Sequence, residues 1–125
     1  MKPSEASQQL MADMLKKPLF VVIRKPRDLT KVSILLEAHL KWTIQAQDRG
    51  ELFASGPFVS DQTSPGELGG MSILRANDEA EALRIMQTDP FIDHGVYDVQ
   101  VHKWLLMEGG MTFHVSFSNQ RFSLL

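Results

Sequence analysis

The residues best suited to proton transfer in this chain are His39 and Asp89. Imidazole titrates near neutral pH and acts as a general acid or base, and a carboxylate on one ring nitrogen holds the ring in one tautomer. Asp89 begins the sequence Asp-Pro-Phe at the end of a predicted helix. Aspartate is common at turns, however, and a lone histidine on an apolar helix face is usually a hydrogen-bonded packing residue. These residues therefore leave two interpretations open, a catalytic pair or a helix-end aspartate beside a packed histidine.

Residues close to His39, and one segment that contains glycine, are candidates for a ligand pocket. Trp42 follows His39 by one helical turn, so it either packs in the core or forms an apolar wall of a pocket. The sequence Ser-Gly-Pro-Phe at 55–58 places a glycine where backbone can approach a ligand, or it merely ends a strand. Ser55 lacks the G-x-S-x-G context of a hydrolase nucleophile, which excludes it from that role.

We predict no cofactor and no metal ion. His39, Asp89 and His94 are residue types that bind zinc, but the spacing is loose and His94 lies in a predicted loop, so a metal site is the minor alternative. The glycines of the central loop do not form a phosphate-binding fingerprint; they are Gly66, Gly69 and Gly70. A charge run near residue 27 would meet an anionic substrate or, as is more common, stay solvated; it comprises Lys25, Arg27 and Lys31.

Composition limits the classes of protein to which the chain can belong. Its 125 residues, 43% hydrophobic and 22% charged, are typical of one globular domain. A net charge of −2 argues against binding nucleic acid through bulk charge. The absence of cysteine excludes disulfides and thiolate chemistry. The longest apolar run, 19–23, is too short to span a membrane and the start has no signal-peptide core, so we expect a cytoplasmic protein without membrane or nucleic-acid partners.

The predicted elements that must position these residues alternate between strands and helices. Apolar or alternating runs predict strands at 19–24, 51–58, 70–76 and 96–106. A helix is predicted from an N-cap at Asp28 to about Arg49, with Gly50 in the C′ position, and a second from Asp78 to Pro90. This order is the ferredoxin-like βαββαβ pattern, an α+β fold with both helices on one face of a four-stranded antiparallel sheet.

Two surfaces follow from this arrangement. The first helix carries an apolar stripe that we expect to face the sheet; it comprises Leu29, Val32, Leu35, Leu36, Leu40 and Ile44. The other sheet face has no helix to cover it, and the alternating Val99 and Val101 suggest that it is buried against a second copy. We therefore expect a homodimer or a higher homo-oligomer.

The ends of the chain lie outside this pattern. A short helix capped by Ser4 is predicted before the first strand. Residues 111–117 alternate as an additional strand, which should pair with a sheet edge in the partner subunit. We divide the chain into an N-terminal extension, 1–18, a ferredoxin-like domain, 19–108, and a C-terminal extension, 109–125.

Several of these residues, in this order, resemble the YciI-like (YCII-related) family over about residues 19–104. The resemblance rests on His39 with Trp42, the sequence Ala-Ser-Gly-Pro-Phe at 54–58, the glycines before the third strand, Asp-Pro-Phe at 89–91, and Trp104. It implies a dimeric α+β barrel with a His39–Asp89 pair in a pocket. It also implies substrate contacts by a small set of residues: Trp42, Ser55, Gly56, Pro57 and Phe91.

The function implied by the resemblance is proton transfer on a small organic molecule. A characterised member of the family eliminates chloride from a chlorinated hydroxyquinol, and similarly folded muconolactone isomerases also move protons. We therefore expect a lyase or isomerase in which His39 moves the proton and Asp89 orients the ring, at about 2.6–3.2 Å or through one water. The alternatives are a non-catalytic small-ligand-binding or accessory protein, and a purely dimeric interaction module.

Overall fold

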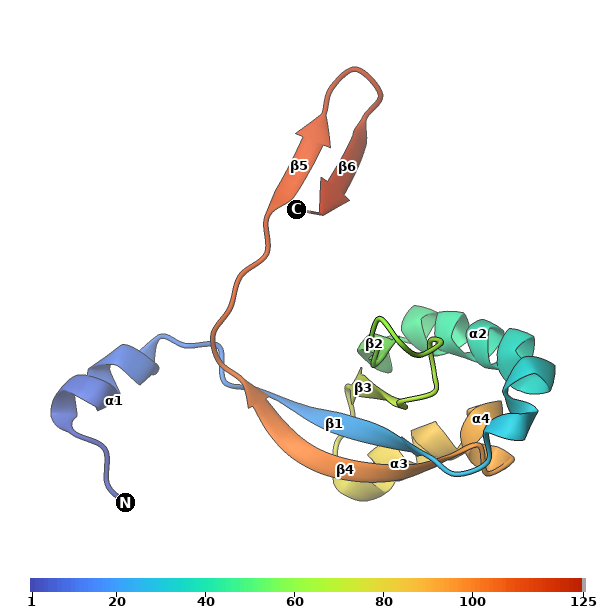
Figure 1. Cartoon of the computed structure of the whole chain (residues 1–125). Helices are drawn as coiled ribbons and strands as arrows, with labels where there is room; N and C mark the ends of the chain where they lie inside the picture. Colours follow the sequence, from blue (N-terminus) through green and yellow to red (C-terminus); the bar gives the residue numbers. More distant parts are fainter. Residues whose placement is uncertain (125) are drawn as a thin grey trace. The chain divides into compact units, whose positions relative to one another are not determined.

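A four-stranded sheet organises the fold, in the strand order β2-β3-β1-β4 (Figure 1). The structure, a computed structural model, describes residues 1–124. The strands are β1 (Lys17–Pro26), β2 (Leu52–Pro57), β3 (Gly70–Leu74) and β4 (Tyr97–Leu106). This order, together with the helices between the strands, is the predicted ferredoxin-like α+β arrangement, which the structure confirms.

The register of the central strands brings polar residues of β2 and β3 together. Both β1 and β2 pair antiparallel with β3, and Ser72 of β3 stands opposite both Val22 and Ser55. An irregularity between Leu52 and Ala54 shifts the pairing of β2 by one residue. Because such a shift changes which side chains share a face, Ser55 of β2 and Ser72 of β3 lie side by side, with their hydroxyl oxygens 2.9 Å apart.

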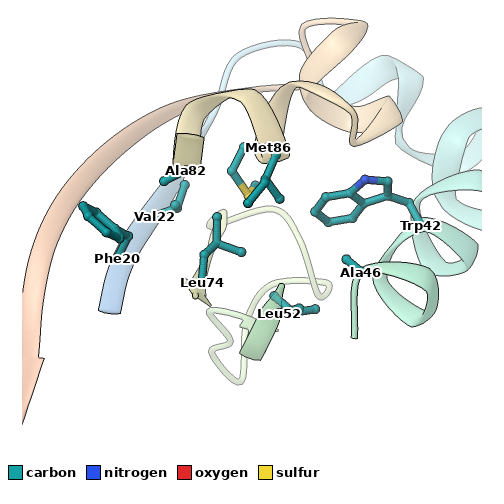
Figure 2. Close-up of a cluster of buried hydrophobic side chains, with 9 residues drawn as sticks. Phe20, Val22, Trp42, Ala46, Leu52, Leu74, Ala82 and Met86 are labelled. Carbon is teal, nitrogen blue, oxygen red and sulfur yellow. The ribbon is translucent and has the colours of Figure 1, made fainter. Parts of the chain in front are cut away.

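Two helices, α2 (Val32–Asp48) and α3 (Glu79–Gln87), bury their apolar residues against the same side of the sheet. Figure 2 shows Trp42 and Ala46 of α2 beside Met86 of α3, over Leu52 and Leu74 of the sheet. The predicted caps are present. A 3₁₀ turn, η1 (Leu29–Lys31), precedes α2, and Asp28 accepts a hydrogen bond from the Thr30 amide. Gly50 follows α2 with φ +80°, the left-handed conformation that favours glycine.

The expected apolar stripe of α2 does not lie fully against the sheet. Leu36, Leu40 and Ile44 are 42%, 50% and 57% exposed, whereas Trp42 and Ala46 are buried. The prediction that the whole stripe faces the sheet was wrong, because α2 is rotated about its axis relative to the predicted orientation. One face of α2 holds the large indole, and packing that ring turns the leucines toward the open side of the helix.

The interpretation of Val99 and Val101 also needs correction. Both side chains pack against the core cluster on the helix-covered side of β4, so they are not part of the uncovered face. The uncovered face is nevertheless apolar at its centre. Val21 stands opposite Ile73 and Ile23 stands opposite Met71 in the antiparallel pairing of β1 with β3, and all four retain partial exposure.

The residues before Pro18 and those after Leu105 form a second compact unit, separate from Pro18–Leu105. It contains α1 (Glu5–Ala12), capped by Ser4 as predicted, and two strands, β5 (Phe113–Ser116) and β6 (Arg121–Leu124). The predicted C-terminal strand is present, but its partner is β6 of the same chain rather than a sheet edge. The domain boundaries at 18/19 and 108/109 stay a prediction. Within residues 1–124, no helix is both long and apolar enough to cross a membrane.

Candidate active site

A short helix that the sequence analysis missed, α4 (Pro90–Asp93), positions Asp89. Asp89 is the N-cap of this helix, and its Oδ1 accepts a hydrogen bond of 3.0 Å from the Phe91 amide. Pro90 occupies the first helical position, where its missing N–H costs nothing and its fixed φ suits the helix. Asp-Pro is thus a helix start, and we had interpreted it only as the end of α3. The cap directs the carboxylate inward.

His39 of α2 meets this carboxylate directly. His39 Nδ1 lies 2.9 Å from Oδ1 and 3.0 Å from Oδ2 of Asp89, which confirms the predicted contact distance. The Asp89 side chain is 0% exposed and that of His39 is 12% exposed. Because an ionised carboxylate only accepts, Nδ1 carries the proton in this contact. The second ring nitrogen, Nε2, takes no part in this contact.

Aromatic residues surround the His39 ring. Phe91 stacks on it with a centroid distance of 4.2 Å and an interplanar angle of 18°. Trp42 lies nearly parallel to the ring at 6.3 Å, and Tyr97 meets Phe91 edge-on at 5.5 Å. A ring that is stacked and hydrogen-bonded in this way has little rotational freedom, so its free nitrogen points in one direction.

Of the two interpretations of Trp42, the structure shows the core position, and its contact with substrate stays a prediction. Trp42 is 6% exposed and belongs to the hydrophobic core, and its Nε1 donates a 2.8 Å hydrogen bond to Thr88 Oγ1. Burying the large apolar indole is favourable, and its N–H keeps a hydrogen-bond partner at Thr88, directly after α3. The core position therefore suits both the apolar body and the polar N–H of the side chain. Its contribution to the site is to pack beside His39 from the core side.

A cavity of about 430 Å³ lies beside His39, within the range of small-molecule sites. Its walls come from α2, from β2, from the loop between β2 and β3, and from single residues of β1, α4 and β4. The residues that line it include Arg24, Leu36, His39, Leu40, Ser55, Gly56, Pro57, Gly66, Gly69, Phe91 and Tyr97. Of the predicted substrate-binding residues, Ser55, Gly56, Pro57 and Phe91 therefore line one cavity with His39.

Two residues of this cavity escaped the sequence analysis. Arg24 is the last residue of the predicted first strand and is not among the predicted site residues, yet it is only 6% exposed. Tyr97 is 4% exposed, and its hydroxyl donates a 2.7 Å hydrogen bond to the Gly66 carbonyl. The signal that could have identified Arg24 is its place in the inward-facing alternation of Phe20 and Val22.

Burial dominates the electrostatics of both residues. It lowers the pKa of Arg24, and the negative charge of Asp89 acts in the opposite direction. Burial also raises the pKa of the Tyr97 phenol, with the Arg24 charge opposing that shift. Tyr97 is therefore a neutral hydrogen-bond donor at neutral pH, while arginine keeps its charge because its intrinsic pKa is so high.

The alternative metal site is not assembled in the structure. His94 follows α4, with its side chain 55% exposed and its Nε2 3.9 Å from Asp93 Oδ2. Within the described part of the chain, no group of three or more His, Cys, Asp or Glu residues is arranged to hold a metal ion. His39 and Asp89 meet each other without the third ligand that the zinc interpretation needs.

Comparisons with known proteins agree with this architecture. A family model described as the YCII-related domain matches residues 18–105. Among solved structures, the chain is similar to 5-chloro-2-hydroxyhydroquinone dehydrochlorinase from Burkholderia phenoliruptrix AC1100, in complex with 2,5-dihydroxybenzoquinone. The sequence identity is 24% and the TM-score 0.58, and the match covers 69% of this chain and 92% of that one. No curated protein matches the chain. At this identity, the structural likeness shows a shared fold.

Proposed function

Since the chain belongs to the YCII-related domain family, we propose that it is a small-molecule enzyme of proton-transfer type, a lyase or an isomerase. His39 moves the proton through Nε2, and Asp89 orients the ring through Nδ1. The residues Ser55, Gly56, Pro57 and Phe91 contact the substrate.

The observation that carries this proposal is the hydrogen bond between His39 Nδ1 and the fully buried Asp89, beside a cavity. A carboxylate in this position holds the imidazole in the tautomer with a basic Nε2, and it stabilises the imidazolium that forms when Nε2 takes a proton. A positioned general base of this kind contributes roughly 10²–10⁴-fold to a rate. The stacked Phe91 keeps the plane of the His39 ring in place before and after Nε2 takes the proton.

The name of the solved relative supports the reaction class. That protein is a dehydrochlorinase, and a dehydrochlorination removes a proton and a chloride ion from one molecule. In the reaction proposed here, His39 Nε2 takes a proton from the substrate and the electron pair of the broken bond stays on the substrate. An isomerase then returns the proton at another atom, whereas a lyase expels a leaving group.

The test is a substrate screen with matched histidine variants. Wild-type protein in D₂O is incubated with 5-chloro-2-hydroxyhydroquinone and a series of small ketones, and chloride release and loss of C–H signals are followed by NMR. For a converted compound, His39→Asn should lower the rate by about 10²-fold or more. His94→Asn, at an exposed histidine, is the control and should leave the rate unchanged. An equally active His39→Asn protein would contradict the proposal.

The alternative is a non-catalytic ligand-binding or accessory protein, for which the cavity of about 430 Å³ is the supporting observation. The same variant separates the two functions. In an enzyme, His39→Asn lowers the rate of conversion by about 10²-fold or more while the ligand still binds. In a binding protein, no compound is converted by the wild type, and the variant changes affinity alone.

We also propose that the protein acts as a homodimer through the uncovered face of the sheet. The apolar centre of that face, formed by Val21, Ile23, Met71 and Ile73, supports this. Sedimentation velocity at micromolar concentration should give the mass of two chains, and Ile23→Glu should shift it to that of one. A wild-type monomer under these conditions would contradict the dimer.

A further inference from the structure

Arg24 is a buried cation whose hydrogen-bond partners are all neutral. Its Nη1 donates to Ser55 Oγ at 3.1 Å and to Ser72 Oγ, and its Nη2 donates to the Gly56 carbonyl at 3.0 Å. No carboxylate of residues 1–124 hydrogen-bonds to this guanidinium. A buried charge is costly unless an opposite charge or ligand balances it. The arrangement therefore lacks a counter-charge within bonding reach.

The surrounding backbone is shaped to hold the guanidinium in place. A Cβ at Gly70 would lie too close to Arg24 Nη2 and to the backbone of Gly56 and Pro57, and because backbone cannot move aside easily, this position favours glycine. The serine pair and the Gly56 carbonyl use three of the five N–H donors that a guanidinium carries. Two donors have no partner in residues 1–124. Arg24 is thus a rigid group that retains hydrogen-bonding capacity.

Arg24 lines the cavity that His39 also lines. Of the described side chains that line it, Arg24 is the only one with a permanent charge. Asp89 is fully buried behind His39, and its oxygens are engaged by the His39 ring and the Phe91 amide. The cavity wall is therefore positive at Arg24, and no acidic side chain on the wall opposes it.

The remaining walls favour an organic body over an inorganic ion. Leu36, Leu40 and Phe91 are apolar, and the cavity of about 430 Å³ is far larger than a sulfate or phosphate requires.

We propose that this cavity binds a small organic anion, a carboxylate, enolate or phenolate, whose charged oxygen pairs with Arg24. The further statement that His39 faces the reactive part of this anion depends on the proposed function. The binding of the anion itself does not depend on it. Arg24 is a substrate-binding residue that sets the charge of the accepted ligand.

The test compares anions with neutral molecules of the same shape. Wild-type protein is titrated at neutral pH with benzoate and benzamide, and with 2,4-dinitrophenolate and 2,4-dinitroanisole, while the amide signals of Gly56 and Gly69 are followed by NMR. In each pair, the anion should bind about tenfold more tightly or better, because charge-assisted hydrogen bonds are the stronger ones. Equal binding within both pairs, or no shift of these amides by either anion, would overturn the proposal.

Matched arginine variants assign the charge preference to one residue. Arg24→Gln keeps hydrogen-bonding groups but removes the charge, so the ratio of the two dissociation constants should fall to about one. Arg27→Gln, at an exposed arginine paired with Asp98, is the control and should keep the wild-type ratio. A folded Arg24→Gln protein with an unchanged ratio would overturn the proposal. If that variant does not fold, the wild-type comparison still decides.

The outcome can be separated from that of the proposed function. His39→Asn should lose conversion but keep the preference for the anion. A wild-type protein that prefers anions and converts no compound would contradict the proposed function while the anion site stands. If the protein converts a neutral compound and shows no preference for anions, the anion site is contradicted while the proposed function stands.

Discussion

Asp78 and Asp89 have the same local role and very different surroundings. Each is the N-cap of a helix, Asp78 accepting a 2.8 Å hydrogen bond from the Glu81 amide and Asp89 a 3.0 Å bond from the Phe91 amide. Asp78 is exposed to solvent and serves only its own helix. Asp89 is 0% exposed and also binds His39, a residue 50 positions away. A common helix-capping residue therefore becomes half of a candidate catalytic pair solely through burial and a second partner.

This difference separates two energetic contributions. A cap contributes about 1 kcal/mol to stability, whether or not the aspartate does anything else. A buried carboxylate adds the interaction with its partner and, when one of the two is removed, the penalty of leaving the other unpaired. Substitutions at Asp89 should thus affect both stability and proton transfer, whereas substitutions at Asp78 should affect stability alone.

The largest expected effect is on catalysis by Asp89→Asn. Asparagine is as good a helix cap as aspartate, but it removes the charge and can present the wrong histidine tautomer. For a compound that the wild type converts, the rate should fall by about 10²-fold or more. Asp78→Asn is the matched control and should keep the wild-type rate. Equal rates in the two variants would reduce Asp89 to a cap. ¹⁵N NMR of the His39 ring should show the altered tautomer in Asp89→Asn only.

The next effect is on stability. Asp89→Ala removes the cap and leaves His39 without its buried partner, so the free energy of unfolding should fall by about 3 kcal/mol. Urea unfolding followed by circular dichroism measures this change. A loss no greater than that of an exposed cap would show that the contact with His39 contributes nothing to the folded state.

Asp78→Ala should cost less, about 1 kcal/mol, because only one capping hydrogen bond is lost. The same urea measurement applies, and it provides the reference for the cap contribution at Asp89. If Asp78→Ala lowered the free energy of unfolding as much as Asp89→Ala does, the claim that burial and the His39 contact add stability at Asp89 would be contradicted.

The smallest effect is expected at a third cap, Asp28, which is partly exposed. The hydrogen bonds from the Thr30 side chain and amide lower the pKa of Asp28 below its ordinary value of 3.8. A carboxyl whose folded-state pKa is lowered stabilises the protein above its unfolded pKa, and that contribution disappears as the pH falls through the folded value. Asp28→Ala should therefore be less stable than wild type at pH 7, and the gap should narrow below pH 3.8. A gap that is constant from pH 7 to below 3.8 would contradict this.

Local patterns in the sequence were sufficient for the elements and their caps. Strand and helix order, the caps Ser4, Asp28 and Asp78, and the glycine after α2 all depend on neighbouring residues, and the structure confirms them. The contact between His39 and Asp89 was anticipated from the order of helices together with the family resemblance. The short helix α4 was missed, although Asp-Pro at its start is a local signal.

What the sequence by itself determined about this protein is its set of elements and the residue types available for chemistry. Only the tertiary structure decided which face of α2 meets the sheet, and hence that Trp42 is core while Leu36 and Leu40 line a cavity. It alone brought Arg24 into that cavity, beside serines of two other strands. The physical reason is that periodicity tells which residues share a face, but burial and partners are set by packing between segments that are distant in the chain.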